Sequence, residues 1–116
     1  MLIGLSALSA QAGYIVDLRQ QGSDVVASAS GAIDLTGLRL FNTTCCDSPA
    51  LNATSAVIIT GRRLSEIDGY TGLVSGPMDF GNGSNVASSG SGDLVALLAR
   101  GDILDVPTGY VSDSPL

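Results

Sequence analysis

Residues 13–35 read G-Y-I-V-D-L-R-Q-Q-G-S-D-V-V-A-S-A-S-G-A-I-D-L, and this stretch decides the fold class. Apolar and polar side chains alternate on both sides of Gln20–Ser23, which has the composition of a turn. The apolar parity comprises Tyr14, Val16 and Leu18 before the turn and Val25, Ala27, Ala29, Ile33 and Leu35 after it. Such alternation with one apolar face is typical of half-buried strands. We therefore predict an antiparallel hairpin from Tyr14 to Leu35 that turns near Gly22.

The rest of the chain reads as short apolar runs separated by Gly, Ser and Pro. We predict strands at 56–60, 94–99 and 103–106, the last one ending at Pro107. Residues 41–54 lack a periodic pattern and are predicted as a loop, and 62–67 is compatible with a short helical turn. About seven short strands with regular turn signals indicate an all-β domain over residues 13–116, either an antiparallel β-sandwich or an incomplete barrel.

Charge and residue types exclude several functions. The 116-residue chain has a net charge of −6, no Lys and five Arg, so it lacks the basic surface that nucleic acids require. It has no His, which excludes Ser-His-Asp and Cys-His catalysis. Apolar residues make up 45% of the chain but aromatic residues only 4%, which predicts a thin aliphatic core. We expect no enzymatic activity, no cofactor and no metal ion.

The first twelve residues, M-L-I-G-L-S-A-L-S-A-Q-A, form a short apolar run that ends in a small-x-small pattern. This pattern is typical of a signal peptide cleaved between Ala12 and Gly13. The first Arg is Arg19, so no basic residue precedes the run. We interpret residues 1–12 as a truncated signal peptide that packs poorly on the domain. The run is too short to span a bilayer.

Four blocks of the sequence resemble exported bacterial proteins of the PEP-CTERM class. They are S-G-A-I-D-L-T-G-L at 30–38, G-P-M-D-F-G at 76–81, S-G-S-G-D at 89–93 and V-P-T-G-Y-V-S-D-S-P-L at 106–116. The resemblance implies a non-catalytic cell-surface or extracellular-matrix protein of a Gram-negative, exopolysaccharide-producing bacterium. Its partners would be exopolysaccharide or other surface proteins.

Proteins of that class end in a Pro-Glu-Pro motif, a membrane helix and an Arg cluster, none of which follows the last block here. We interpret the chain as a fragment that lacks its C-terminal strands, with a released relative of the class as the alternative. Missing strands leave neighbouring strands unpaired. We expect an exposed apolar edge near Leu94–Ala99 or Ile103–Val106, and self-association through it.

Cys45 and Cys46 are adjacent, and the sequence leaves their state open. Consecutive Cα atoms lie about 3.8 Å apart, which is shorter than the usual span of a disulfide. The alternatives are two incidental thiols in a loop, a strained vicinal disulfide, a soft-metal site and an intermolecular link.

The remaining polar motifs are weak. Asp79–Asn85 and Ser89–Asp93 offer oxygen ligands but lack the spacing of an EF-hand or a stacked β-roll. Glu66 is the only Glu, whereas a glycosidase needs two positioned carboxylates. A small secreted hydrolase would therefore require two buried carboxylates close together in a cleft.

The few aromatic residues carry a second alternative. We predict that Tyr70 and Phe80 are the main core anchors, because large rings are the most effective fillers of a thin core. If Tyr14, Tyr70 and Tyr110 were instead exposed together on one sheet face, they would favour a carbohydrate-binding module acting on exopolysaccharide.

Overall fold

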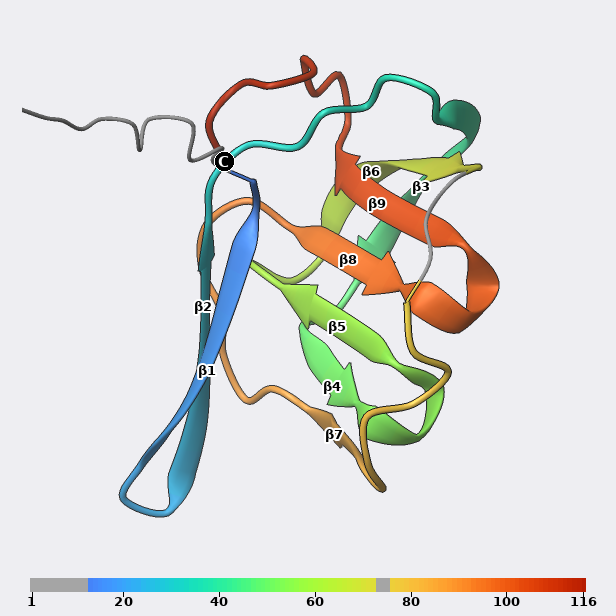
Figure 1. The fold of residues 1–116 in the computed structure, drawn as a ribbon. Helices are drawn as coiled ribbons and strands as arrows, with labels where there is room; N and C mark the ends of the chain where they lie inside the picture. Colours follow the sequence, from blue (N-terminus) through green and yellow to red (C-terminus); the bar gives the residue numbers. More distant parts are fainter. Residues whose placement is uncertain (1–12, 73–75) are drawn as a thin grey trace, which may run out of the picture.

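The computed structural model describes residues 13–72 and 76–116 as an all-β protein (Figure 1). Along the chain the strands are β1 (Ile15–Gln21), β2 (Asp24–Ser30), β3 (Arg39–Asp47), β4 (Ala50–Asn52), β5 (Val57–Thr60), β6 (Ser65–Thr71), β7 (Ser84–Val86), β8 (Val95–Leu98) and β9 (Ile103–Pro107). Two short 3-10 turns, η2 (Ala53–Ser55) and η3 (Ala99–Gly101), precede β5 and β9. Residues 1–12, which we interpret as a truncated signal peptide, lie outside the described residues.

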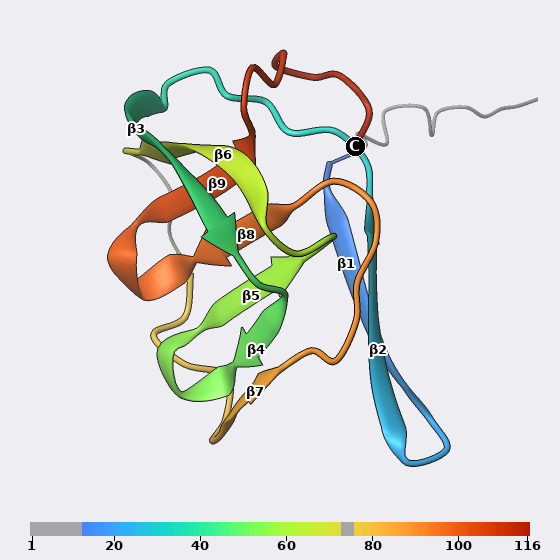
Figure 2. The ribbon, with the colours of Figure 1, turned by 180° about the vertical axis from the view of Figure 1, so that it is seen from behind.

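The strands form two antiparallel sheets. β1 and β2 make a hairpin, and the other seven strands make one sheet in the order β3-β6-β9-β8-β5-β4-β7. In Figure 2 the hairpin lies to one side of the large sheet as a separate, smaller layer. This arrangement confirms the predicted all-β fold and is sandwich-like, without a closed barrel.

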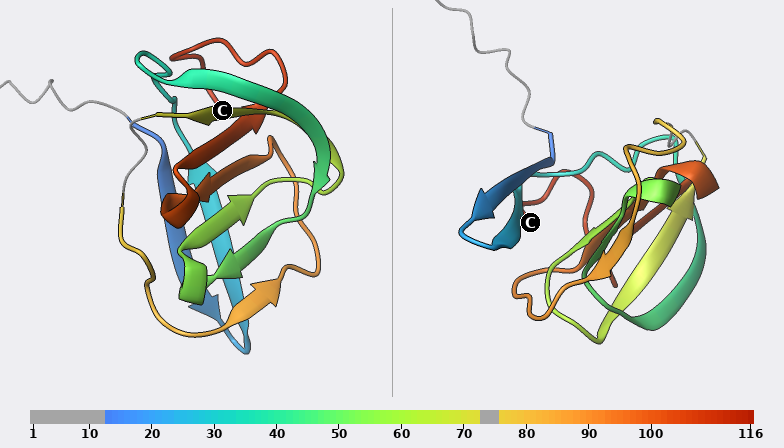
Figure 3. Two further views of the ribbon diagram at one scale, coloured as in Figure 1. Left: turned by 90° about the vertical axis from the view of Figure 1, so that its right-hand side faces the viewer. Right: turned by 90° about the horizontal axis from the view of Figure 1, so that it is seen from below.

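A short connection makes the large sheet curl. β3 is one edge strand and β4 lies beside the opposite edge, yet only Ser48 and Pro49 join them. The sheet must therefore bend round until these distant strands come near each other, as the two views of Figure 3 show. The inner face of the curl buries Ile67 and Ala96, which are 1% and 0% exposed.

The predicted hairpin and its turn near Gly22 are confirmed, but β2 ends at Ser30, so Ile33 and Leu35 lie beyond the paired strands. Ile15 pairs with Ser30 at the open end, and Gln21 pairs with Asp24 at the turn. The two turn residues are Gly22 and Ser23, and only Gly22 has a positive φ, at 62°. One positive φ at the first turn position is the pattern of a type II′ turn, which matches the twist of a two-stranded ribbon.

Two local predictions were wrong. Residues 41–54 form most of β3, all of β4 and η2 rather than a loop, and 62–67 leads into β6 rather than a helical turn. β3 shows no apolar alternation because it is an edge strand, exposed along nearly its whole length and interrupted by two shifts of register. β6 is fixed by pairing to β3 and β9 at once, and this non-local pairing overrides the local pattern.

The predicted exposed edge was also wrong. β8 lies between β5 and β9, and β9 lies between β6 and β8, so both strands are central. β8 is apolar throughout and β9 is apolar except for Asp105, as expected of central strands. The edges of the large sheet are β3 and β7 instead.

The outer face of the large sheet carries the second part of the core. Val95, Leu104 and Val106 form a buried cluster, and the partly buried side chains packed against it are Tyr14, Ile33, Leu35, Leu38, Tyr70, Tyr110 and Leu116. Tyr70 thus contacts the core as predicted. Phe80 does not, since it is 43% exposed, and its segment is held by a hydrogen bond from its N–H to the Ala53 carbonyl (2.9 Å).

A clasp between residues 31–35 and 110–116 fixes the hairpin to the large sheet. The Tyr110 hydroxyl accepts from the Ile33 N–H (2.9 Å) and donates to the Ser114 carbonyl (2.6 Å). The Asp113 N–H donates to the Ile33 carbonyl (2.8 Å). The Leu35 N–H donates to Ser112 Oγ (2.8 Å), which continues the clasp along the chain.

A second close contact involves two glycines. Gly90 lies against the backbone of Gly61, and a Cβ at Gly90 would also come within 3.0 Å of Pro49 Cγ. The Arg62 N–H donates to the Gly92 carbonyl (3.0 Å) beside it. The absence of side chains at Gly61 and Gly90 allows the long β7–β8 connection to pack directly on the sheet.

We predict that Tyr110→Phe lowers the free energy of unfolding by about 1–3 kcal/mol, because it leaves the Ile33 N–H and the Ser114 carbonyl without their partner. Urea unfolding followed by circular dichroism measures this loss. Tyr70→Phe is the matched control, since no described residue bonds to that hydroxyl. Equal stability of both variants would contradict the role assigned to the Tyr110 hydroxyl.

Gly90→Ala should destabilise the protein by about 1–3 kcal/mol, because the added methyl group overpacks the contact with Gly61 and Pro49. Gly13→Ala adds the same group where nothing lies within 4 Å and serves as the control. Thermal unfolding of the two variants side by side tests this expectation. An unchanged midpoint for Gly90→Ala would show that the β7–β8 connection moves aside without cost.

Candidate functional site

The structure joins Cys45 and Cys46 in a vicinal disulfide near the end of β3. Their Cα atoms are 3.6 Å apart, and the pairing of β3 with β6 shifts register between Cys45 and Asp47. Cys46 has a φ of 86°, a backbone conformation that costs energy for a residue with a side chain. Of the alternatives that the sequence left open, the structure contains the bond between neighbours.

This disulfide is accessible. Both cysteines are exposed, and β3 is a free edge of the sheet, so a thiolate from solution can approach either sulfur atom. The exchange that this geometry permits consumes one external thiol and releases one cysteine thiol. The site therefore supports redox chemistry of the disulfide itself, but the described surroundings supply no His or Lys to activate it.

A pair of carboxylates lies on the inner face of the curl. Asp105 of β9 is 7% exposed and pairs with Gly69, where a Cβ would come within 3.0 Å of Asp105 Oδ1. Burial raises the pKa of Asp105 to about 6, and the nearby Asp47 adds to the effect through its charge and a hydrogen bond. The protonated Asp105 can thus donate to the Asp47 carboxylate.

The other buried acid serves the fold on the opposite face. Asp68 pairs with Val106 and Gly69 pairs with Asp105, so Asp68 and Asp105 point to opposite faces of the sheet. Asp68 accepts from Thr43 Oγ1 (2.7 Å) and from the Gly109 N–H (2.9 Å). Asp68 and Asp105 therefore do not form the paired arrangement that a glycosidase requires, and Asp47 and Asp105, which share a hydrogen bond, are closer together than the separation of about 5 Å in that arrangement.

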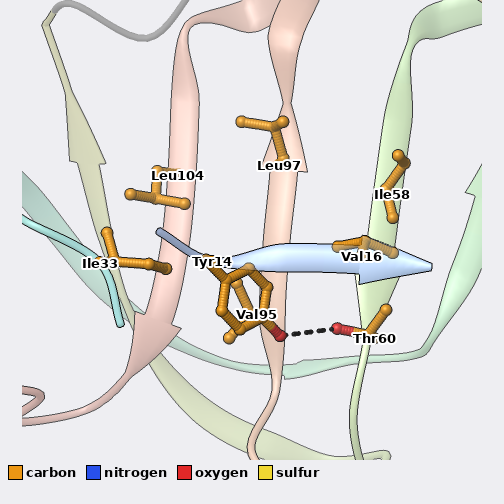
Figure 4. Close-up of a pocket in the computed structure, with 8 residues that line it drawn as sticks. All are labelled: Tyr14, Val16, Ile33, Ile58, Thr60, Val95, Leu97 and Leu104. Atoms are coloured by element: carbon orange, nitrogen blue, oxygen red, sulfur yellow. Dashed lines mark hydrogen bonds between the residues drawn. The ribbon is translucent and has the colours of Figure 1, made fainter. Parts of the chain in front are cut away.

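An apolar hollow of about 190 Å³ separates the hairpin from the large sheet (Figure 4). Its lining residues come from both layers and are Tyr14, Val16, Ile33, Ile58, Thr60, Val95, Leu97 and Leu104. The only side-chain hydrogen bond between these lining residues joins the Tyr14 hydroxyl to Thr60 Oγ1 at 3.2 Å. Burial raises the pKa of the Tyr14 phenol, so this hollow offers apolar contact and a neutral hydroxyl pair.

The three tyrosines are used in packing. Tyr14, Tyr70 and Tyr110 are all partly buried against the outer-face core, rather than exposed together. Each ring packs against aliphatic neighbours, so the three do not form a platform on which sugar rings could stack. The arrangement that would favour a carbohydrate-binding module is not found among the described residues.

The remaining predicted positions are dispersed. Gly13 is exposed and directly precedes β1, and Ala12 lies outside the described residues. Glu66 and Asp93 both line a shallow polar groove beside Pro107, and Asp79 lies elsewhere on the surface. Within the described ranges no group of three or more acidic or cysteine residues could hold a metal ion.

Asp105 is the residue that the sequence reasoning missed. It interrupts the apolar run I-L-D-V-P of a predicted strand, and it shares a parity with Ile103 and Pro107 rather than with polar residues. A charged residue inside a strand covered on both faces is the signal that could have identified it.

Comparison with known proteins gives no relative. No family model matches the chain, and neither the curated proteins nor the solved structures contain a match. Among the residues that the structure describes, no helix has the length and apolar character needed to cross a membrane.

We predict that stability falls as the pH rises from about 4 to about 7. The folded pKa of Asp105, about 6, exceeds the unfolded value of about 3.9. The folded state therefore binds the proton more tightly, and its contribution is complete below about pH 4 and lost as the pH passes 6. Asp105→Asn should remove this slope and be more stable than the wild type above pH 7, by on the order of 1–3 kcal/mol.

Two further variants test the cause. Asp47→Asn removes the neighbouring charge and should reduce the slope, whereas Asp24→Asn changes an exposed acid on the hairpin and should leave it unchanged. Chemical unfolding at a series of pH values measures all four proteins. An Asp105→Asn profile that parallels the wild type would show that this group does not titrate as described.

Proposed function

We propose that the chain is a non-catalytic, exported cell-surface or extracellular-matrix protein of the PEP-CTERM class. The observation that supports this proposal is the role that the four sequence blocks resembling this class have in the structure. Their residues make the contacts that hold the fold, and they do not converge on a reactive centre.

The first and last blocks meet in the clasp. Ile33 of the 30–38 block and Tyr110 of the 106–116 block are joined by a hydrogen bond, and the Leu116 N–H donates to the Gly31 carbonyl at 2.8 Å. Two segments that resemble the same class thus contact each other directly. A shared sequence pattern of this kind is expected when the requirement is structural, because both halves of a contact must be retained together.

The two middle blocks have similar roles. In the 76–81 block, the Phe80 N–H bonds to η2, and Arg100 Nε donates to the Met78 carbonyl at 3.3 Å. In the 89–93 block, Gly90 provides the close approach to Gly61. The Gly and Ser content of these blocks is explained by backbone packing, which supports a binding or structural role over catalysis.

The disulfide supports export. Structural disulfides persist in oxidising compartments and are rare where cellular thiols keep cysteines reduced. An exposed vicinal pair such as Cys45–Cys46 would be open to reduction in the cytosol. In this proposal, exopolysaccharide or other surface proteins are the partners, and the exposed faces of the domain contact them.

We predict that the chain, placed behind a complete signal n-region in a Gram-negative, exopolysaccharide-producing host, is recovered outside the cytoplasm with Gly13 as its first residue. Cleavage there leaves β1 intact, because the first paired residue is Ile15. Mass spectrometry gives the new N-terminus, and alkylation before and after reduction gives the state of Cys45 and Cys46. We expect alkylation of both cysteines only after reduction.

An Ala12→Arg variant is the matched control, because a bulky charged residue at the cleavage position blocks processing without changing residues 13–116. Retention of the unprocessed parent chain in the cytoplasm, with both cysteines reduced, would contradict the proposal. Hydrolysis of exopolysaccharide by the purified protein would contradict its non-catalytic part.

A further inference from the structure

The four free strand edges of the described residues are not equally protected. Natural edge strands are blocked by short length, bulges or charge. β7 has three residues, β3 has two register shifts, and β1 carries the ion pair of Asp17 with Arg19 (2.6 Å). β2 reads D-V-V-A-S-A-S, with seven residues, no shift of register and no charge after Asp24. It is the one edge here that lacks these protections.

The backbone groups at this edge alternate in direction. Because Gln21 and Asp24 close a two-residue turn, the even-numbered residues of β2 bond to β1. The odd-numbered residues point outward, and the Leu116 N–H accordingly reaches the outward Gly31 carbonyl (2.8 Å). The N–H and C=O groups of Val25, Ala27 and Ala29 therefore face away from β1, and no described residue bonds to them.

The chain already occupies one end of this edge. Pro115 forms an antiparallel bridge with Ala32, and Leu116 lies opposite Gly31. Any strand added to β2 must therefore stop before the position opposite Gly31. The available part runs from Val25 to Ala29 and includes Val25, which is 64% exposed.

We propose that two copies of the chain pair their β2 strands, antiparallel, about a two-fold axis through Val26. An antiparallel pair needs outward residues opposite outward residues, which allows an axis at Val25, Val26 or Ala27. With the axis at Ala27, Ser23 of the second copy would fall opposite Gly31, where Leu116 lies. With the axis at Val25, the outward groups of Ala27 would face only the turn of the second copy.

The axis at Val26 also matches the side chains. Val25 of each copy lies opposite Ala27 of the other, so apolar side chains lie beside apolar side chains on both sides of the axis. Asp24 lies opposite Ser28 and not opposite a second Asp24, so no like charges meet. The two Val26 side chains face each other in a non-hydrogen-bonded pair, where Cα atoms are only about 4.5 Å apart.

A cysteine at the axis tests this register. In Val26→Cys the two new thiols of a dimer lie within disulfide range, so mild oxidation of the full chain should give a dimer that reduction reverses. Ser28→Cys places the same thiol on the same face, but four residues separate the two copies along the strand, or about 13 Å. We expect little or no cross-linked dimer from Ser28→Cys. Equal cross-linking of both variants, or none of Val26→Cys, would overturn the proposal.

Sedimentation at increasing protein concentration tests the association without a cross-link. The wild type should change from monomer to dimer. Ala27→Pro removes an outward N–H and leaves the bonds to β1 in place, so it should remain monomeric. Ile15→Lys changes an exposed side chain of β1 (66% exposed) and should dimerise like the wild type. A wild type that stays monomeric at millimolar concentration would overturn the proposal.

Amide hydrogen exchange provides a readout for single residues. In the monomer, the Val26 and Ser28 amides are protected by β1, and those of Val25 and Ala27 exchange rapidly. Dimer formation should increase protection at Val25 and Ala27 alone, by at least tenfold at millimolar concentration. Loss of protection at Val26 and Ser28 in Ala27→Pro would reveal a damaged hairpin. In that case the cross-linking of Val26→Cys and Ser28→Cys decides whether β2 pairs as proposed. Protection at Val25 and Ala27 that does not depend on concentration would overturn the proposal.

Discussion

The hydroxyl of Tyr110 is the contact on which the packing of the two layers depends. Its bond to the Ile33 N–H joins residues 77 positions apart, so it links an early and a late segment of the chain. The core that it supports is aliphatic and small, with Ile67, Leu94 and Val106 as the largest fully buried side chains. In such a core, a few directional bonds decide how the hairpin sits on the sheet, because apolar burial alone does not fix orientation.

The same reasoning explains what the sequence blocks mean. Gly and Ser in these blocks allow close backbone approach and hydrogen bonds to main-chain groups, as at Gly90 and Ser112. Similarity in such blocks therefore indicates how the backbone packs, whereas function has to be argued from the surface residues. The exposed disulfide, the apolar hollow and the open edge of β2 are the surface features from which it can be argued.

The sequence predicted those elements whose pattern is local. The hairpin and its turn were predicted because both strands alternate, and β5, β8 and β9 because their sequences are mainly apolar. β3 was missed because an exposed edge strand needs no alternation, and the central place of β8 and β9 follows from pairings between distant segments. At the site, the adjacency of Cys45 and Cys46 indicated a choice between chemical states, whereas the buried position of Asp105 depends on the curl of the sheet.

The open edge of β2 limits how strong its pairing can be. Its outward amides are hydrated in the monomer, so each new hydrogen bond gains only about 0.5–1.5 kcal/mol. Two copies must also lose translational and rotational freedom, which costs several kcal/mol. Burial of Val25 adds to the gain, but the small side chains of Ala27 and Ala29 contribute little area. A β2 pair is therefore weak in dilute solution and would form mainly where copies are held close together, as they would be on a cell surface or in a matrix.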